Sequence, residues 1–263
     1  MKNVFVEGIQ GAGKSTLVDC LSKALPQLCV YREGDYSPVD LAWCAWMTPG
    51  EHAAMLNRFP ALKEDILRLT TQEGSHLVTA YTKIRTDDSS VYRTFEDYEI
   101  YNGRKTLEEL KEIIFARYEA YLGTDALFEC AFFQNIIEEL MLYHQLSDDE
   151  IVAFYRELFG RVKREDFLLL YLYSDHLQEN IAAIRRERCD AQGREIWYEM
   201  LLSFFTNCPY GKAHGYAGFD DIINHLCRRQ QLEMRIIREV IGKRAVVLAS
   251  RRWEMEAVMA QLA

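Results

Sequence analysis

The segment from Gly8 to Ser15 combines glycines, a lysine and a hydroxyl group in an order suited to holding phosphate. It reads GIQGAGKS and fits the pattern G-x-x-x-x-G-K-[ST]. Glycines allow a loop whose backbone N–H groups converge on an anion, and a helix that starts behind the loop adds its positive end. The predicted nucleotide-binding residues are Gly8, Gly11, Ala12, Gly13, Lys14, Ser15 and Thr16.

Two side chains of this loop have distinct predicted roles. Lys14 is expected to reach the β- and γ-phosphates of ATP, and Ser15 to offer its hydroxyl to Mg²⁺. The alternative is a glycine turn with a chance lysine. The apolar residues before the loop and the helical pattern behind it favour nucleotide binding, because the motif requires a strand before it and a helix after it.

The wider segment VEGIQGAGKST resembles the phosphate loops of thymidylate kinases and deoxynucleoside kinases. It departs from the thymidylate kinases at Gln10, where they usually carry an acid. The segment YREGDYSP resembles the part of both families that follows the second strand, and Glu33 matches their acid. The resemblance implies that Glu33 is a general base on an accepting hydroxyl. Asp35, two residues on, is the reserve base, and Tyr36 is a further candidate for binding the acceptor.

The segment DALFECAF is an apolar strand that ends in an acid, where these families have Asp-Arg or Glu-Arg. The resemblance implies that Glu129 holds the metal, directly or through water. The alternative is a strand end that faces solvent. Cys130 stands where relatives carry an arginine that contacts the acceptor, which leaves the acceptor's identity open. Gln134 and Asn135 are expected either to read a base edge or to cap a helix.

A predicted lid covers residues of about 176–196 and begins as a helix. Its apolar stripe comprises Leu177, Ile181 and Ile184. Arg185 and Arg188 are three residues apart and can face one anion together. This segment resembles the lid of nucleoside and nucleotide monophosphate kinases, whose arginines close over the transferring phosphoryl group. The alternative is a solvated face paired with Glu187 and Asp190.

Other chemistry-bearing residues lie near the ends of predicted strands. In the related kinases the segment that corresponds to SRRW touches adenine, so Ser250, Arg251 and above all Arg252 are expected to flank the ATP base. Tyr36, Trp43 and Trp46 could stack on a ring, although aromatic residues at this spacing are more often core. The helix RRQQLEMRIIRE is predicted to be an amphipathic surface helix, and the histidines have no predicted role.

Alternating strands and helices are expected to position these residues. The predicted strands are Val4–Val6, Leu28–Tyr31, Ala126–Glu129, Phe167–Tyr173 and Ala245–Ala249. Capping patterns at Thr106 and Ser147 predict helix starts, Gly123 and Gly160 the corresponding ends, and Gly242 the end of a later long helix. The fold class is therefore α/β: a three-layer sandwich of the P-loop NTPase type, with a mainly parallel five-stranded sheet, a helical lid and insertions.

The 263 residues are interpreted as one domain. An insertion is expected at about 50–105, helical from near Pro60 and then rich in aromatic residues.

Composition narrows the class of partner and compartment. The net charge of −9 argues against a nucleic-acid surface, because binding to phosphate backbones needs a basic face. The longest apolar run, FLLLYLY, is far shorter than the roughly 20 residues of a membrane helix. No membrane partner is therefore expected. Seven scattered cysteines without a C-x-x-C pair indicate reduced thiols and a cytoplasmic protein. The oligomeric state stays open, a homodimer included.

These residues together predict an ATP-dependent, Mg²⁺-requiring phosphotransferase of the P-loop kinase type. The acceptor is a small molecule, a nucleoside or nucleoside monophosphate first, with another hydroxyl compound such as an antibiotic as the alternative. A regulatory NTPase would share the loop, but it would usually show N-K-x-D or a long apolar strand that ends in D-x-x-G, and the sequence has neither feature. An idle nucleotide-binding module is the remaining alternative.

Overall fold

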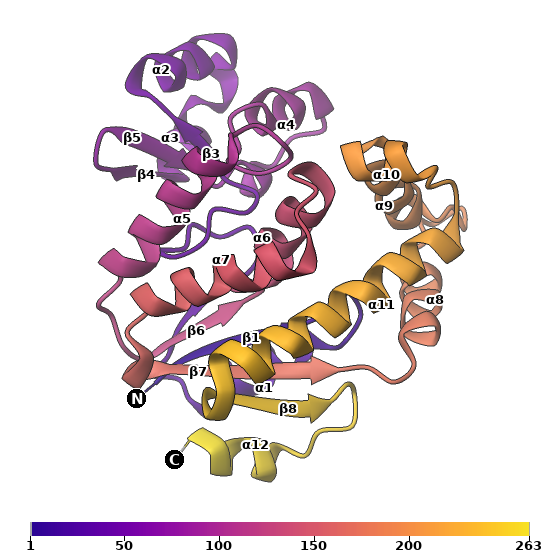
Figure 1. Ribbon diagram of the computed structural model, residues 1–263. Coiled ribbons are helices and arrows are strands. Elements are labelled where there is room, and N and C mark those ends of the chain that lie inside the picture. Colours follow the sequence, from indigo (N-terminus) through magenta and orange to yellow (C-terminus); the bar gives the residue numbers. More distant parts are fainter. Residues whose placement is uncertain (1, 263) are drawn as a thin grey trace. The chain divides into compact units, whose positions relative to one another are not determined.

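The computed structural model describes residues 2–262 (Figure 1). The chain divides into two compact units. The first unit comprises the residues up to Val30 and those from Leu122 onward, and the second unit comprises Tyr31–Tyr121. The expected insertion at about 50–105 lies within the second unit.

A five-stranded sheet forms the centre of the first unit, with the strand order β2-β6-β1-β7-β8. Its strands are β1 (Asn3–Gly8), β2 (Cys29–Tyr31), β6 (Ala126–Glu129), β7 (Phe167–Tyr173) and β8 (Ala245–Ala249). Strand β1 pairs in parallel with β6 and β7, and β7 pairs in parallel with β8. The predicted α/β class, the mainly parallel sheet and all five predicted strand positions are confirmed, with shifts of one or two residues at some ends.

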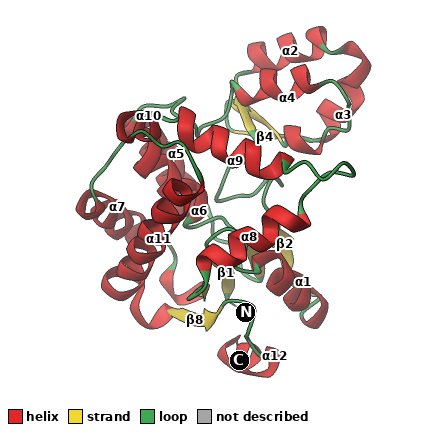
Figure 2. Cartoon of the chain, turned by 90° about the vertical axis from the view of Figure 1, so that its right-hand side faces the viewer, coloured by secondary structure: helices red, strands yellow, loops and turns green. Residues whose placement is uncertain are grey.

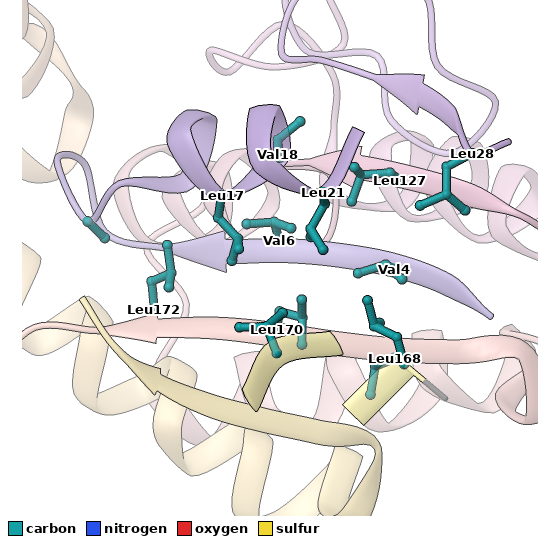
Figure 3. Packing of buried hydrophobic residues seen from close by; sticks show 13 residues of the cluster. Val4, Val6, Leu17, Val18, Leu21, Leu28, Leu127, Leu168, Leu170 and Leu172 are labelled. Carbon is teal, nitrogen blue, oxygen red and sulfur yellow. The ribbon is translucent and has the colours of Figure 1, made fainter. Parts of the chain in front are cut away.

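The two faces of this sheet are covered differently because side chains alternate along each strand. Val4 and Val6 of β1 pack with the leucines of β7 and with α1 (Lys14–Ala24) and α12 (Met255–Leu262) (Figure 3). Phe5 points to the other face, where it stacks on Phe128 and Phe167. Helices α7 (Asp148–Arg161) and α11 (Phe219–Ile236) supply side chains to that face. The first unit is therefore built in three layers.

Further helices follow the strands of the first unit (Figure 2). They are α6 (Gln134–Glu138), α8 (Leu177–Glu187), α9 (Ile196–Asn207) and α10 (Pro209–His214). Wider helical turns continue α6 over Glu139–Tyr143 and α11 over Ile237–Ile241, and Gly242 ends the latter at a φ of 60°. The expected helix end near Gly242 is confirmed.

The helix starts predicted from capping residues are confirmed at both positions. Thr106 and Ser147 each accept a hydrogen bond from the backbone N–H of the glutamate three residues on, whose carboxylate bonds back to the cap. They begin α5 (Leu107–Ala120) and α7. The predicted helix ends are close to the observed ones, since α7 ends at Arg161, one residue after Gly160, and α5 ends at Ala120, three residues before Gly123.

The second unit has its own sheet and core. A three-stranded antiparallel sheet has the order β3-β5-β4. Its elements besides α5 are α2 (Pro49–Arg58), α3 (Lys63–Arg68), α4 (Ser89–Glu96), β3 (Ala45–Met47), β4 (Thr70–Glu73) and β5 (His76–Thr79). A single helical turn at Pro60–Leu62 leads into α3, near the predicted helix start. Buried Met47, Ile66 and Phe95 form part of the core of this unit.

Among residues 2–262, none of the helices combines the length and the apolar composition needed to span a bilayer.

Candidate functional site

The glycine loop, residues 8–15, connects β1 to α1 in the strand–loop–helix order that the motif requires. Gly8, Gly11 and Gly13 have φ values of 144°, 81° and 94°, which side-chain-bearing residues rarely adopt. Gly13 is the N-cap of α1, so the first N–H groups of this helix open toward the loop. The loop therefore combines three glycines of positive φ with the start of a helix, and its binding of an anion stays a prediction.

Two of these glycines also permit close packing. A Cβ atom on Gly8 would lie 2.7 Å from the carbonyl oxygen of Leu172 in β7. One on Gly11 would lie 2.3 Å from Cδ1 of Ile184 in α8. The loop is thus fixed between the end of the sheet and the helix that carries the predicted lid arginines.

Lys14 lies over the glycine loop. Its side chain is buried, and its Nζ donates to the carbonyl oxygens of Gly8 at 2.8 Å and Ile9 at 3.2 Å. The ammonium group therefore sits where the loop's backbone turns, and it satisfies carbonyls of the loop itself. Thr16, one of the predicted binding residues, is exposed in the first turn of α1.

Ser15 and Glu129, the two predicted metal-binding residues, are brought together. The Ser15 hydroxyl donates to Oε1 of Glu129 at 2.5 Å, although the two residues are 114 positions apart. Pairing of β1 with β6 places the end of β6 beside the start of the loop. A hydroxyl and a carboxylate are oxygen donors of the kind Mg²⁺ prefers, and Mg²⁺ is usually held by one or two carboxylates together with phosphate oxygens. The residues present therefore fit the predicted ion.

The turn after Glu129 is held by its own side chains. Cys130 has a φ of 60°, and its Sγ lies 3.6 Å from Oε1 of Gln134, to which it donates. Asn135 Nδ2 donates to the carbonyl oxygen of Cys130 at 3.2 Å. Gln134 and Asn135 thus both bind this turn at the start of α6. Their predicted contact with an acceptor stays a prediction.

Glu7 is a buried carboxylate for which the sequence predicted no role. It ends the apolar part of β1 and accepts hydrogen bonds from the backbone N–H groups of Phe132 at 2.5 Å and Gln134 at 3.4 Å. Burial raises the pKa of Glu7 to about 7, against the lowering effect of the backbone N–H groups of Phe132 and Phe133. An acid between an apolar strand and the first glycine, as in VFVEG, is the sequence signal that could have identified it.

A cluster of buried charges lies on the α11 side of the sheet. The fully buried Arg229 pairs with Glu138 and, at 2.9 Å, with Glu233. Glu233 also accepts a 2.5 Å hydrogen bond from the Tyr171 hydroxyl of β7. His225 Nε2 lies 2.7 Å from Oε2 of Glu138. Burial alone would raise the pKa of Glu138, but the charges and hydrogen bonds of His225 and Arg229 outweigh it and lower this pKa to about 2.

The expected amphipathic surface helix is correct only in part: the stretch exposes Gln231, Arg238 and Glu239, but its buried side carries charged residues that were not predicted from the sequence. Its charged residues Arg229 and Glu233 are buried, where they pair with each other, Glu138 pairs with Arg229, and the Tyr171 hydroxyl donates to Glu233. Sequence alone reads an Arg and a Glu four residues apart as an exposed helical ion pair.

The predicted lid residues lie on or beside α8, whose apolar stripe is buried as expected. Arg185 donates to Glu195 at 2.6 Å, and its guanidinium lies 3.8 Å from the ring centre of Tyr198. Arg188 lies 5.3 Å from the ring centre of Trp197. The two arginines are thus held over different rings. Their predicted closure over a phosphoryl group stays a prediction.

The segment after β8 reaches the glycine loop. Ser250 Oγ donates to the carbonyl oxygen of Ala12 at 2.9 Å, and Arg251 Nε donates to that of Gly11 at 3.0 Å. Asn180 of α8 donates to Ser250 Oγ at 3.3 Å. The structure therefore joins the SRRW segment to the loop through Ser250 and Arg251. For Arg252, the predicted contact with the ATP base stays a prediction.

Three predicted acceptor residues belong to the second unit. Glu33 accepts a 3.0 Å hydrogen bond from the indole N–H of Trp43. Asp35 accepts from the backbone N–H of Arg32 at 2.9 Å and pairs with Lys83 at the same distance. Asp35 is thereby held within its own turn, and the predicted roles of both acids stay predictions.

The third, Tyr36, belongs to a group around the buried Arg117. Tyr36 donates to Glu73 at 3.1 Å, and Arg117 binds both Glu73 and the carbonyl oxygen of Ser37. The Arg117 guanidinium lies 5.9 Å from the ring centres of Tyr36 and Trp46.

The rings of this unit are used differently. Trp46 stacks on His76 with ring centres 4.3 Å apart, whereas Trp43 is 44 % exposed. Trp46 therefore serves packing, and Trp43 stays a candidate for stacking on a ligand.

Neither the protein-family models nor the curated proteins include a match to this chain.

Proposed function

We propose that the chain is an ATP-dependent, Mg²⁺-requiring kinase that transfers a γ-phosphoryl group to a small acceptor, a nucleoside or nucleoside monophosphate first. The proposal is supported above all by the hydrogen bond between Ser15 and Glu129, which lies at the end of the glycine loop that also contains Lys14. A lysine, a hydroxyl and a carboxylate converging on one helix start are the groups that nucleotide phosphates and their metal ion require.

Each group has a chemical task in this proposal. The backbone N–H groups of the glycine loop and the positive end of α1 bind the phosphates. Lys14 exchanges its loop carbonyls for phosphate oxygens, and Ser15 and Glu129 hold the ion. When bound, Mg²⁺ neutralises charge on the β- and γ-phosphate oxygens. Arg185 and Arg188 are the candidates for neutralising the group in transfer, because phosphoryl transfer depends mainly on positioning and charge.

Glu33 is the proposed base for a hydroxyl acceptor. Its carboxylate, which accepts a hydrogen bond from the indole N–H of Trp43, is the group that would take the proton. For the acceptor we propose only its chemical class, which is a nucleoside or a nucleoside monophosphate. A nucleoside requires a base for its hydroxyl, whereas a monophosphate is already ionised and requires none.

Product analysis with γ-labelled ATP tests the proposal. A thermal-shift screen of nucleosides, nucleoside monophosphates and aminoglycoside-like hydroxyl compounds first selects acceptors, since a ligand that binds the folded state raises its stability. We expect ADP to form only when an acceptor is present, with the label on that acceptor. Release of labelled phosphate without an acceptor would support an NTPase instead, and absence of nucleotide binding would refute the proposal.

Lys14→Ala should abolish transfer, because the ammonium group is used on phosphate. Lys23→Ala is the matched control, since Lys23 is exposed in the last turn of the same helix. Equal turnover of both variants would remove the glycine loop from the mechanism.

A further inference from the structure

Glu7 has no task in the proposed transfer, yet it is fully buried directly before the glycine loop. Burying a carboxylate is costly unless its oxygens receive hydrogen bonds. Its Oε1 accepts from the N–H of Phe132 and its Oε2 from the N–H of Gln134. Both oxygens are thus engaged by a single segment of backbone, and that segment begins immediately after Glu129.

This segment joins Glu129 to α6 and is attached to β1 at two successive residues. The N–H of Cys130 donates to the carbonyl oxygen of Val6 at 3.2 Å, and the next attachment is to the side chain of Glu7. Cys130 has a φ of 60°, a conformation that is unfavourable for a non-glycine residue and persists only where surrounding contacts hold it. The attachments to β1 supply such contacts.

The start of α6 depends on Glu7 for the same reason. Phe133, the residue before the helix, offers no side-chain cap. Helix starts leave backbone N–H groups unpaired, and a carboxylate near them is favourable both as an acceptor and through its charge. Charged groups near Glu7 also include Glu233 of α11 and Lys14 of the glycine loop. Glu7 therefore takes the place of a local cap and binds the turn to the strand that leads into Gly8.

We propose that Glu7 is a positioning residue that holds the Glu129 carboxylate opposite the Ser15 hydroxyl. This inference rests on the proposed function, in which these two groups hold the metal ion of the nucleotide. The 2.5 Å contact between Ser15 and Glu129 joins the loop after β1 to the end of β6. Glu7 lies in β1, the strand that leads into the glycine loop, and it binds the turn that follows Glu129. The same strand therefore fixes both the loop and this turn. A neutral amide is a poor substitute, because the two N–H donors bind different oxygens of Glu7 and glutamine replaces one of these oxygens with an NH₂ group, which is itself a donor.

Binding of a fluorescent ATP analogue, mant-ATP, with Mg²⁺ and with EDTA at about pH 8 tests this without relying on turnover. For wild type we expect Mg²⁺ to increase affinity. Glu7→Gln should reduce that increase by about tenfold or more, the usual effect of removing a group that orients a metal ligand. Its affinity in EDTA should stay within about twofold of wild type, because the glycine loop still binds phosphate.

Two further variants calibrate the measurement. Ser15→Ala removes a proposed ligand and should lose the Mg²⁺ effect. Ser147→Ala removes the cap of α7 and so lowers stability, and it should keep the Mg²⁺ effect unchanged. If Glu7→Gln retains the wild-type Mg²⁺ effect, or loses affinity equally in EDTA, Glu7 is only a structural cap and the inference is overturned.

Glu7→Asp keeps the inference testable if the glutamine variant does not fold. Aspartate preserves both oxygens but is shorter by one methylene, so we expect a Mg²⁺ effect at least about threefold below that of wild type. An unchanged effect would overturn the inference. A wild-type chain that does not bind mant-ATP overturns the proposed function and this inference with it. A wild-type Mg²⁺ effect that persists in the Glu7 variants overturns the inference alone.

Discussion

Adding a single methyl group at Gly11 tests how the glycine loop is held. In Gly11→Ala the new Cβ would lie 2.3 Å from Ile184 Cδ1 and 3.2 Å from Cγ1, at a φ of 81°. The left-handed backbone costs alanine roughly 1–2 kcal/mol. Forcing a methyl into a filled site costs roughly 1–3 kcal/mol more. We therefore expect the free energy of unfolding to fall by about 2–5 kcal/mol, and mant-ATP binding to weaken.

Gly193→Ala is the matched control for the backbone contribution. Gly193 has a φ of 78°, close to that of Gly11, but an added Cβ meets nothing within 4 Å. This variant should lose only the roughly 1–2 kcal/mol of backbone strain. Urea unfolding of both variants therefore separates backbone strain from the contact with α8.

Ile184→Val removes the atom responsible for the closest contact. Alone it should cost roughly 0.5–1.5 kcal/mol, because Ile184 is buried. Combined with Gly11→Ala it should be less destabilising than the sum of the single changes, by about 1–3 kcal/mol, since residues in contact are coupled. Additive effects, together with equal losses for Gly11→Ala and Gly193→Ala, would refute the packing of α8 against the loop.

The features that were predicted from sequence are those with a local signal. The strand Phe167–Tyr173 is a continuous apolar run, as expected for a strand buried on both faces of a parallel sheet. Thr106 and Ser147 carry complete capping boxes. In each case, residues close together in the sequence determine the outcome. Glu129 was identified as a candidate metal ligand because it ends an apolar strand of the same kind.

The second unit shows why other parts were missed. Strand β3 has three residues, Ala45–Met47, too few to display an alternating pattern. It forms because its residues pair with β5 and because the N–H of Trp46 donates to the carbonyl oxygen of Tyr98, 52 positions away. A strand that depends on distant partners leaves no local trace.

Two predictions remain. The first concerns Glu99 in the second unit, where burial raises the pKa of the carboxyl group from 4.5 to about 7 against the lowering effect of hydrogen bonds from Tyr81 and Asn102. Because the folded state holds this proton more tightly than the unfolded state, Glu99 contributes stability that is fully present below about pH 4.5 and is lost as the pH rises through 7. Urea unfolding should show that wild type loses up to about 3 kcal/mol over this range relative to Glu99→Gln, and parallel pH curves would contradict it. The second concerns Glu33, which distinguishes a hydroxyl acceptor from a phosphate acceptor. A hydroxyl must lose its proton during transfer, so Glu33→Gln should reduce kcat by roughly 10²–10⁴-fold with ATP affinity unchanged. Asp35→Asn is the control, because the Asp35 carboxylate is already bound by Lys83 and its own turn, and it should retain most of its turnover. If Glu33→Gln retains near-wild-type kcat on the true acceptor, no base acts there, and a monophosphate becomes the better acceptor.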